Sequence, residues 1–138
     1  KTRRMQSIPP ALIEPFNAPV AKRIPRLKRP QKLDENASVI KKNYQVRYFD
    51  LDANHHVNNA RYFDFAFSDL GMDYLNEHQL KQVVIKYEKE VLPESTISCS
   101  TLWEENTLES QERRQTYHLI SQDGNRCANI QMEWEEIV

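Results

Sequence analysis

The stretch VRYFDLDANHHVNNARYFDFAF, residues 46–67, contains the signals that decide the fold of this chain. Tyr44, Val46 and Tyr48 alternate with polar neighbours, which predicts a half-buried strand at its start. A polar loop follows, and the chain then continues as a predicted helix from Asn58 to Leu75. Since a helix that is apolar on two sides is expected to be enclosed by protein, we predict a central, buried helix. Its apolar positions are Ala60, Phe63, Phe67, Leu70 and Tyr74 on one side and Tyr62, Phe65 and Ala66 on the other.

Four further strands are predicted after this helix, and apolar residues alternate in the first, second and fourth of them. They lie around Val83–Tyr87, Ile97–Trp103, Glu112–Ile120 and Ala128–Trp134. Asp123-Gly124 predicts a tight hairpin between the last two strands. One strand, one helix and four consecutive strands predict an α+β domain, in which an antiparallel sheet of about five strands wraps a long central helix.

The first 39 residues differ from the rest in proline content and charge. Six of the seven prolines lie here, which disfavours long helices and central strands. Residues 1–32 contain nine Lys or Arg and one acid, a net charge of +8, whereas residues 33–138 contain ten basic and 19 acidic residues, a net charge of −9. We therefore expect a basic, proline-rich connector over residues 1–39, with one or two helical turns across Pro9 to Glu14 capped by Ser7, and a folded domain over residues 40–138.

The composition argues against several classes of protein. No apolar run approaches the roughly 20 residues that span a bilayer, and the first residues have no apolar signal-peptide core, so a soluble protein is expected. Two glycines are too few for a glycine-rich phosphate loop, which argues against the common kinds of nucleotide-dependent chemistry. Cys99 and Cys127 lack the spacing of a zinc site and are expected to be buried, reduced thiols.

The loop DLDANHHVNN, residues 50–59, concentrates the polar residues that could carry chemistry. A calcium site is one interpretation, since Asp50, Asp52 and Asn54 match the first, third and fifth positions of an EF-hand loop. However, its sixth position should be Gly and is His55, its twelfth should be Glu and is Arg, and no helix is predicted before it. A second interpretation is purely structural, because Asp and Asn are common in turns and helix caps.

A catalytic loop is the third interpretation. Asp52, Asn54 and His56 supply a carboxylate, an amide and an imidazole at alternate positions, which can converge where a turn leads into a helix. The backbone amides of Val57 to Asn59 would then face the substrate at the positive end of the helix, where an oxyanion is stabilised. This combination suits acyl transfer, with the carboxylate as base or nucleophile, the imidazole as proton carrier and the amides as oxyanion donors.

The same stretch, Val46 to Phe67, resembles the signature of the plant and bacterial acyl-ACP (acyl carrier protein) thioesterases. The pattern of that family is a DxNxHVNN loop that runs into the central helix of a hot-dog fold. The segment IKYEKEV, Ile85 to Val91, is similar to the strand segment of the family that carries a functional Glu. Residues 2–4, TRR, are similar to an element in the connector between the two hot-dog domains of the family. The resemblance therefore covers nearly the whole chain in the same order.

The resemblance implies an enzyme that hydrolyses the thioester of fatty acyl-ACP, releases a free fatty acid and ends chain elongation, without a metal or a cofactor. It assigns the catalytic residues as Asp52, Asn54, His56 and Glu90. Simple alternation alone would place Glu90 on a solvated face of its strand, so its role rests on the resemblance. Some members have Cys directly after this Glu; Val91 stands here, so a carboxylate-centred mechanism is expected. Residues expected to shape the loop and cap the helix are Asp50, His55, Asn58 and Asn59.

The resemblance also implies partners. The substrate is borne by an acidic acyl carrier protein, and the basic connector, with Arg23, Arg26 and Arg29, could steer that protein to the site or could simply keep the connector soluble. A second hot-dog domain is expected, either the amino-terminal half of the same protein or a second copy of this domain. Neither nucleic acid nor a membrane is an expected partner, and a bacterial cytoplasmic location is expected.

Two other functions stay open from the sequence. One is an acyl-CoA thioesterase of the homo-oligomeric hot-dog group, although those proteins usually lack a long basic connector. The other is a non-catalytic hot-dog module that binds acyl chains or scaffolds a partner. The joint presence of Asp52, Asn54, His56 and Glu90 speaks against the non-catalytic alternative.

Overall fold

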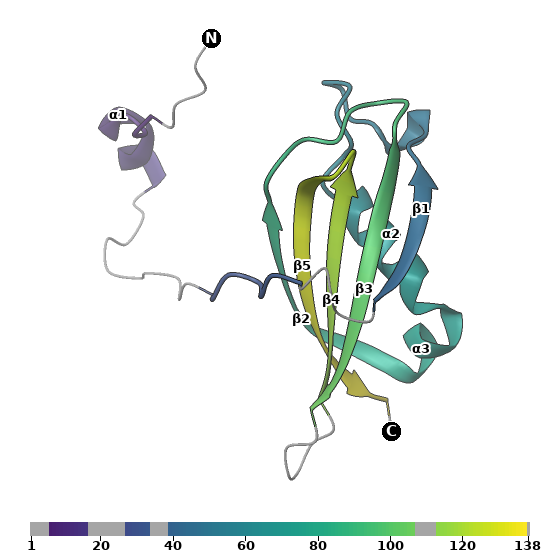
Figure 1. The fold of residues 1–138 in the computed structure, drawn as a ribbon. Helices are drawn as coiled ribbons and strands as arrows, with labels where there is room; N and C mark the ends of the chain where they lie inside the picture. Colours follow the sequence, from purple (N-terminus) through teal and green to yellow (C-terminus); the bar gives the residue numbers. More distant parts are fainter. Residues whose placement is uncertain (1–5, 17–26, 34–38, 107–112, 138) are drawn as a thin grey trace.

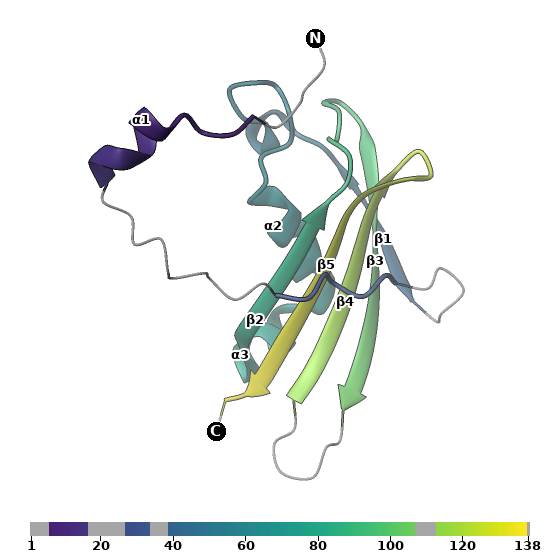
Figure 2. The ribbon, with the colours of Figure 1, turned by 90° about the vertical axis from the view of Figure 1, so that its left-hand side faces the viewer.

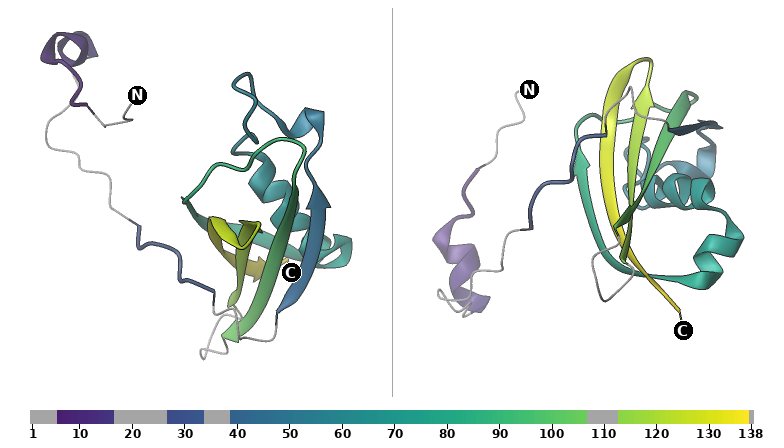
Figure 3. Two further views of the ribbon diagram at one scale, coloured as in Figure 1. Left: turned by 45° about the horizontal axis from the view of Figure 1, so that its top comes forward. Right: turned by 60° about the horizontal axis from the view of Figure 1, so that its bottom comes forward.

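The computed structural model describes residues 6–16, 27–33, 39–106 and 113–137 of the chain. A five-stranded antiparallel sheet, in the order β1-β3-β4-β5-β2, curves around two helices (Figure 1 and Figure 3). The strands are β1 (Ile40–Gln45), β2 (His78–Tyr87), β3 (Thr96–Asn106), β4 (Arg113–Gln122) and β5 (Asn125–Glu136), and the helices are α2 (Arg61–Leu70) and α3 (Met72–Glu77). This arrangement confirms the predicted α+β hot-dog fold.

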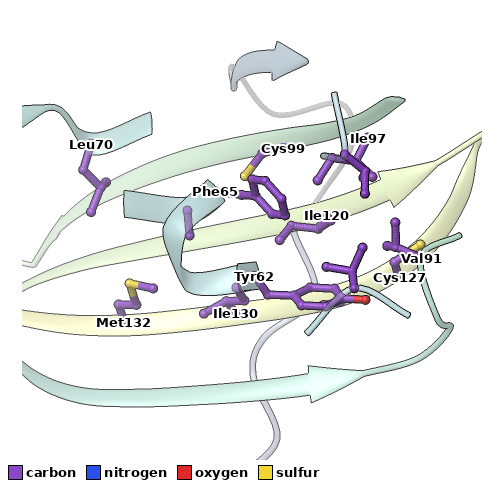
Figure 4. Close-up of a cluster of buried hydrophobic side chains, with 14 of the residues drawn as sticks. Tyr62, Phe65, Leu70, Val91, Ile97, Cys99, Ile120, Cys127, Ile130 and Met132 are labelled. Atoms are coloured by element: carbon purple, nitrogen blue, oxygen red, sulfur yellow. The ribbon is translucent and has the colours of Figure 1, made fainter. Parts of the chain in front are cut away.

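The side of α2 that faces the sheet carries deeply buried residues of the core (Figure 4). Tyr62, Phe65 and Ala66 are at most 6% exposed, and they belong to one cluster with Ile120 of β4 and Ile130 of β5. Burying a large apolar side chain contributes roughly 1.5–3 kcal/mol, so this layer fixes α2 on the sheet. Both predicted apolar sides of the helix contact protein, and the side with Tyr62 is the more deeply buried.

The helix predicted from Asn58 to Leu75 starts later and is interrupted, so its predicted bounds are wrong. α2 begins at Arg61, because the side-chain and backbone carbonyls of Asn58 accept the amides two and three residues later. Gly71 has φ 85° and ψ 159°, a conformation that glycine alone adopts readily, and it separates α2 from α3. The apolar spacing continues across this break because Tyr74 of α3 packs against the same core.

The first strand ends earlier than predicted, and Tyr48 is not on its buried face. β1 ends at Gln45, and Tyr48–Asp50 form the 3-10 helix η2, in which Tyr48 is 77% exposed. The Asp50 carboxylate accepts the Arg47 amide at 2.8 Å and so caps this turn. Local capping therefore overrides the alternation of the sequence.

The hairpin between β4 and β5 and the two thiols agree with the predictions. Asp123 and Gly124 have φ values of 50° and 73°, as the two central residues of a type I′ hairpin require. Cys99 and Cys127 are free and buried, and burial raises the pKa of both thiols.

Part of the connector lies on the outer face of the sheet, opposite the helices (Figure 2). Leu33 is buried there, in a small cluster with Tyr117 and Leu119 of β4. The Gln31 amide donates to the side chain of Gln131 on β5, at 3.0 Å. The end of the connector is therefore packed on the domain.

Nearer the amino terminus, a short helix forms where the sequence predicts one. It consists of α1 (Pro10–Ile13) and the 3-10 turn Glu14–Phe16. The helix begins after Pro9 without a side-chain cap, so the predicted Ser7 cap is wrong. Among the described residues, no helix combines the length and the apolar character needed to cross a membrane.

Candidate active site

A tight loop between η2 and α2 folds Asp52 and His56 around each other. The Asp52 Oδ1 atom accepts the backbone amides of Asn54 at 2.8 Å and of His56 at 3.1 Å. The Asp52 amide donates to the His56 carbonyl at 2.8 Å, and His55 takes a φ of 59° that turns the chain back. The amide of His56, and then that of Asn54, lowers the pKa of the Asp52 carboxyl, so Asp52 is a carboxylate at neutral pH.

Asp50 and Asn58 hold this loop at the start of α2. The buried Asp50 carboxylate lies 3.6 Å from Arg47 Nε and 3.9 Å from Arg61 Nε. The Asp50 carbonyl accepts the Asn58 amide at 2.8 Å. The Asn58 amide is therefore engaged within the protein, which corrects the expectation that every amide from Val57 to Asn59 faces the substrate.

Glu90 reaches the loop because β2 ends in an irregular turn. The amides of Glu88 and Lys89 both donate to the Cys127 carbonyl, at 2.8 and 3.2 Å, so the alternation of the strand is broken before Glu90. The Glu90 Oε2 atom then lies 3.6 Å from Nε2 of His56. Since the two side chains are 50% and 34% exposed, this pair contributes only about 0–1 kcal/mol to stability.

These groups line an open pocket of about 380 Å³. Asp52, His56 and Glu90 give it polar atoms, and Tyr62 and Tyr87 give it an aromatic wall, with ring centroids 5.3 Å apart in an edge-to-face arrangement. Burial raises the pKa of both phenols, so they stay protonated at neutral pH. The other lining residues are Val57, Asn58, Asn59, Glu88 and Lys89. Such a pocket can hold a carbonyl group and move a proton beside it.

The structure brings three of the four residues predicted as catalytic to this pocket. Asn54 lies at the exposed tip of the loop, outside the lining residues, and its backbone amide is bonded to Asp52. Of the arginines predicted for docking, Arg29 is exposed, and Arg23 and Arg26 lie outside the described residues. The catalytic and docking roles of these residues stay predictions.

Tyr62, Tyr87, Glu88 and Lys89 line the pocket but are not predicted as residues of the site from the sequence. The apolar patterns predict Tyr62 and Tyr87 only on the inner faces of the helix and the strand, where they do lie. Tyr62 is the inward-facing residue nearest the polar loop, and Tyr87 is the inward-facing residue nearest Glu90. This closeness in sequence is the signal that could have identified them. Lys89 carried no such signal, because it lines the pocket only through the irregular turn after β2.

A second carboxylate and histidine lie in the core near the other end of α2. Tyr44 donates to Asp69 Oδ1 at 2.5 Å, and Thr101 donates to Asp69 Oδ2 at 2.7 Å. Because the Thr101 proton is used in that bond, its oxygen accepts from His118 Nδ1–H at 2.9 Å. None of these contacts is predicted from the sequence.

The other ring nitrogen of His118 completes a chain of hydrogen bonds. Its Nε2 atom accepts from Thr116 at 3.0 Å, and the Trp134 indole donates to the Thr116 oxygen, also at 3.0 Å. Burial lowers the pKa of His118 to about 4, against the opposing attraction of Asp69, so the imidazole is neutral as these bonds require. We call this set the buried network: Tyr44, Asp69, Thr101, Thr116, His118 and Trp134.

One group of three possible metal ligands occurs among the described residues. The ligand atoms of Asp69, Cys99 and His118 lie within 4.8 Å of one another. The Thr101 hydroxyl bonds to both Asp69 and His118 and lies 4.0 Å from the Cys99 sulfur. A zinc thiolate needs a deprotonated sulfur, whereas burial raises the pKa of Cys99. Hydrogen bonding to Thr101 therefore accounts for the closeness of Asp69 and His118, and Cys99 lies beside the same hydroxyl.

Comparisons with known proteins identify relatives of the chain. Residues 33–136 match the family model of the acyl-ACP thioesterase C-terminal domain. Over 110 residues the chain is 32% identical to a chloroplastic dodecanoyl-[acyl-carrier-protein] hydrolase of Cinnamomum camphora, a match that covers 73% of the chain and 28% of that protein. The chain thus spans less than a third of the length of this curated relative.

Two solved structures resemble the chain over almost all of its length. A protein named as an oleoyl thioesterase of Lactobacillus plantarum has 37% sequence identity and a TM-score of 0.80, covering 99% of this chain and 52% of that one. The 12:0-ACP thioesterase of Umbellularia californica has 25% identity and a TM-score of 0.75, covering 98% of this chain and 50% of that one. The chain corresponds to about half of each solved chain.

Proposed function

The chain belongs to the acyl-ACP thioesterase family, and on this premise we propose that it carries the active site of an enzyme that hydrolyses fatty acyl-ACP. The reaction cleaves the thioester, releases a free fatty acid and ends chain elongation in fatty acid biosynthesis. The observation that carries this proposal is the open pocket in which Asp52, His56 and Glu90 meet beside the start of α2.

In the proposed mechanism a water molecule attacks the thioester carbonyl and gives its proton to His56. Glu90, 3.6 Å away, orients the imidazole and stabilises its charged form. Two amide hydrogen bonds make the Asp52 carboxylate a weak base, so we assign it to positioning the water and stabilising the imidazolium. When the carbon–sulfur bond breaks, the imidazolium returns the proton to the departing thiolate.

Hydrolysis assays on the full-length protein test this function. Asp52→Asn keeps an oxygen that accepts both loop amides, so the loop should be preserved, yet turnover of acyl-ACP should fall at least about a hundredfold because the charge is lost. The matched control is Asp73→Asn, which changes an exposed acid of α3 outside the pocket and should keep its turnover.

Three outcomes of these assays contradict the proposal in different ways. Full activity in Asp52→Asn overturns the mechanism. Faster hydrolysis of acyl-CoA than of acyl-ACP supports an acyl-CoA thioesterase instead. Hydrolysis of neither substrate supports a non-catalytic acyl-binding module.

We also propose that the basic connector helps to dock the acidic acyl carrier protein. The charge of +8 over residues 1–32 supports this, and Arg29 is exposed. Charge reversal at Arg23, Arg26 and Arg29 should raise the Michaelis constant for acyl-ACP and leave a small thioester unaffected. The effect should fade with added salt, since the screening length is roughly 10 Å at 0.1 M. Equal losses on both substrates would argue against docking.

A second hot-dog domain is proposed to complete the acyl-chain pocket. The chain covers only about half of the solved relatives, which leaves room for such a domain in the same polypeptide or in a second copy. β1 and β2 are the two edge strands of the sheet, where another sheet can add. The molar mass of the full-length protein in solution distinguishes a tandem monomer from a self-paired dimer.

A further inference from the structure

We propose that Glu88 is a positioning residue of the active site, which holds Glu90 beside His56 from the outer face of the sheet. This inference rests on the proposed function where kinetics test it. Its test by NMR depends on the geometry alone. Glu88 also lines the pocket, two residues before Glu90.

Two side chains donate hydrogen bonds to the same oxygen of the Glu88 carboxylate. Its Oε1 atom accepts from Lys86 Nζ at 2.7 Å and from Asn129 Nδ2 at 3.0 Å. Asn129 is buried and lies directly opposite Lys86 in the pairing of β2 with β5. The hydrogen bond from Lys86 is the largest cause that lowers the pKa of Glu88, and the attraction of Lys32 and Arg126 adds to it. Glu88 is therefore a carboxylate held by one donor from β2 and one from β5.

The connector side of the molecule fixes the orientation of Asn129. Arg126 Nη1 donates to Asn129 Oδ1 at 3.4 Å, and Arg126 Nη2 donates to the Leu33 carbonyl at 3.3 Å. Because the oxygen of the Asn129 amide faces Arg126, its NH₂ group must face Glu88. The packed end of the connector thus supports the donor that holds Glu88.

Glu90 lies between two anchors. On one side, the Glu88 carboxylate is bound to Asn129, and the Glu88 and Lys89 amides both donate to the Cys127 carbonyl. On the other side, Val91 is 1% exposed in the core. The Glu90 side chain itself is 50% exposed, so these neighbours rather than burial set its place. A misplacement of a catalytic group by about 1 Å can lower the rate up to about a hundredfold. Loss of the Glu88 anchor should therefore displace Glu90 and slow hydrolysis.

Kinetics of Glu88 variants in the full-length protein test the positioning role. Glu88→Ala should lower kcat for acyl-ACP about tenfold or more, with little change in KM, because the pocket remains but its acid is displaced. Glu88→Gln keeps an oxygen for the Asn129 amide and should recover kcat to within about threefold of the wild type. The matched control, Glu135→Ala, removes an acid of the same β2–β5 pair that binds Lys81 far from the pocket, and should keep kcat.

A charge swap at the same contact sharpens the test. Asn129→Asp places two carboxylates together and should lower kcat about tenfold or more. Adding Glu88→Gln to this variant restores an N–H donor toward the new carboxylate and should recover most of the loss. If Asn129→Asp does not fold, the Glu88→Ala result alone decides. An unchanged kcat in Glu88→Ala, or a Gln variant as slow as the Ala variant, overturns the proposal.

The ring resonances of His56 report the position of Glu90 without any substrate. In NMR spectra of the full-length protein, Glu88→Ala should move the His56 ring signals in the direction that Glu90→Gln moves them, and Glu88→Gln should not. Unchanged His56 signals in Glu88→Ala overturn the positioning role even if hydrolysis is observed. The expected shifts in a protein that hydrolyses nothing would support the positioning role while the proposed function fails.

Discussion

Two carboxylate–histidine arrangements flank α2, and they differ in access to solvent. In the buried network, Asp69 and His118 are joined through Thr101, and the atoms of both side chains are bonded within the core. In the open pocket, Glu90 and His56 face each other at 3.6 Å with half-exposed side chains. One carboxylate–histidine pair is therefore enclosed in the core at one end of the helix, and the other lines an open pocket at the opposite end.

The difference shows what makes a histidine available for proton transfer. Burial lowers the pKa of His118 to about 4 and its two ring nitrogens are both hydrogen-bonded, so the imidazole stays neutral at neutral pH. His56 lines a pocket beside two carboxylates, Asp52 and Glu90, which in the proposed mechanism stabilise the imidazolium as it forms. Composition alone does not distinguish the two histidines; their surroundings do.

Removing the imidazole from the open pocket should have the largest effect. His56→Ala should lower turnover of acyl-ACP at least about a hundredfold, because the proton carrier is lost, with little change in the free energy of unfolding. Steady-state kinetics and chemical denaturation measure the two quantities. His55→Ala is the control, since the neighbouring ring is exposed and outside the pocket, and its effect should be mild. Equal losses in the two variants would contradict the assignment of His56.

Breaking the buried network should affect stability instead. Thr101→Val removes the donor to Asp69 and the acceptor for His118, and should lower the free energy of unfolding by roughly 3–5 kcal/mol. Thr96→Val on the same strand removes an exposed hydroxyl that bonds to Gln45, and should change stability by less than about 0.5 kcal/mol. If Thr101→Val were as stable as the wild type, the network would not hold the core.

The pH dependence of unfolding should carry the signature of His118. Its pKa is about 4 in the folded chain and near 6.5 when unfolded, so between these values the unfolded chain binds the proton and the folded chain does not. Stability from this group is therefore complete above about pH 6.5 and is lost as the pH falls to about 4, on the order of 3 kcal/mol. Denaturation curves at each pH measure it, and His118→Gln should flatten the slope. An unchanged slope in that variant would assign the effect to other groups.

The smallest effect is expected where α2 ends, close to Asp69. Gly71→Ala should cost about 2 kcal/mol, because φ 85° and ψ 159° suit glycine alone, while an added Cβ would meet no atom within 4 Å. Gly124→Ala in the hairpin, at φ 73°, should cost about 1 kcal/mol. Thermal unfolding compares the two. Turnover per folded molecule should stay unchanged in both variants. A loss of turnover in Gly71→Ala would indicate that the two ends of α2 are energetically coupled.

Most of the fold could be predicted because its signals are periodic and local. Alternation along β3 and β5, the two apolar sides of α2 and Asp123-Gly124 each dictate an element without reference to the rest of the chain. The errors lie where a local contact competes with periodicity. The capping of η2 by Asp50 removed Tyr48 from the strand, and the backbone of Gly71 divided the helix.

The candidate site was predictable only in part. The loop residues Asp52 and His56 are close in sequence, so their meeting follows from a short turn. Glu90 follows a different strand, and alternation alone predicts that it faces solvent. Only the family resemblance predicts Glu90 at the site. The amides of Glu88 and Lys89 share the Cys127 carbonyl, and this irregular turn brings Glu90 to the loop. The buried network could not be predicted, because Asp69 and Thr101 come from different elements and meet only through the tertiary fold.

The most direct test makes the same chemical change in each region, carboxylate to amide, and measures turnover of acyl-ACP per folded molecule together with the free energy of unfolding. Glu90→Gln should lower turnover at least about a hundredfold and leave unfolding within about 0.5 kcal/mol of the wild type. Asp69→Asn should keep turnover and lose stability, since Tyr44 and Thr101 donate to both oxygens of the Asp69 carboxylate. Full turnover in Glu90→Gln would contradict the account, whatever the stability of the two variants.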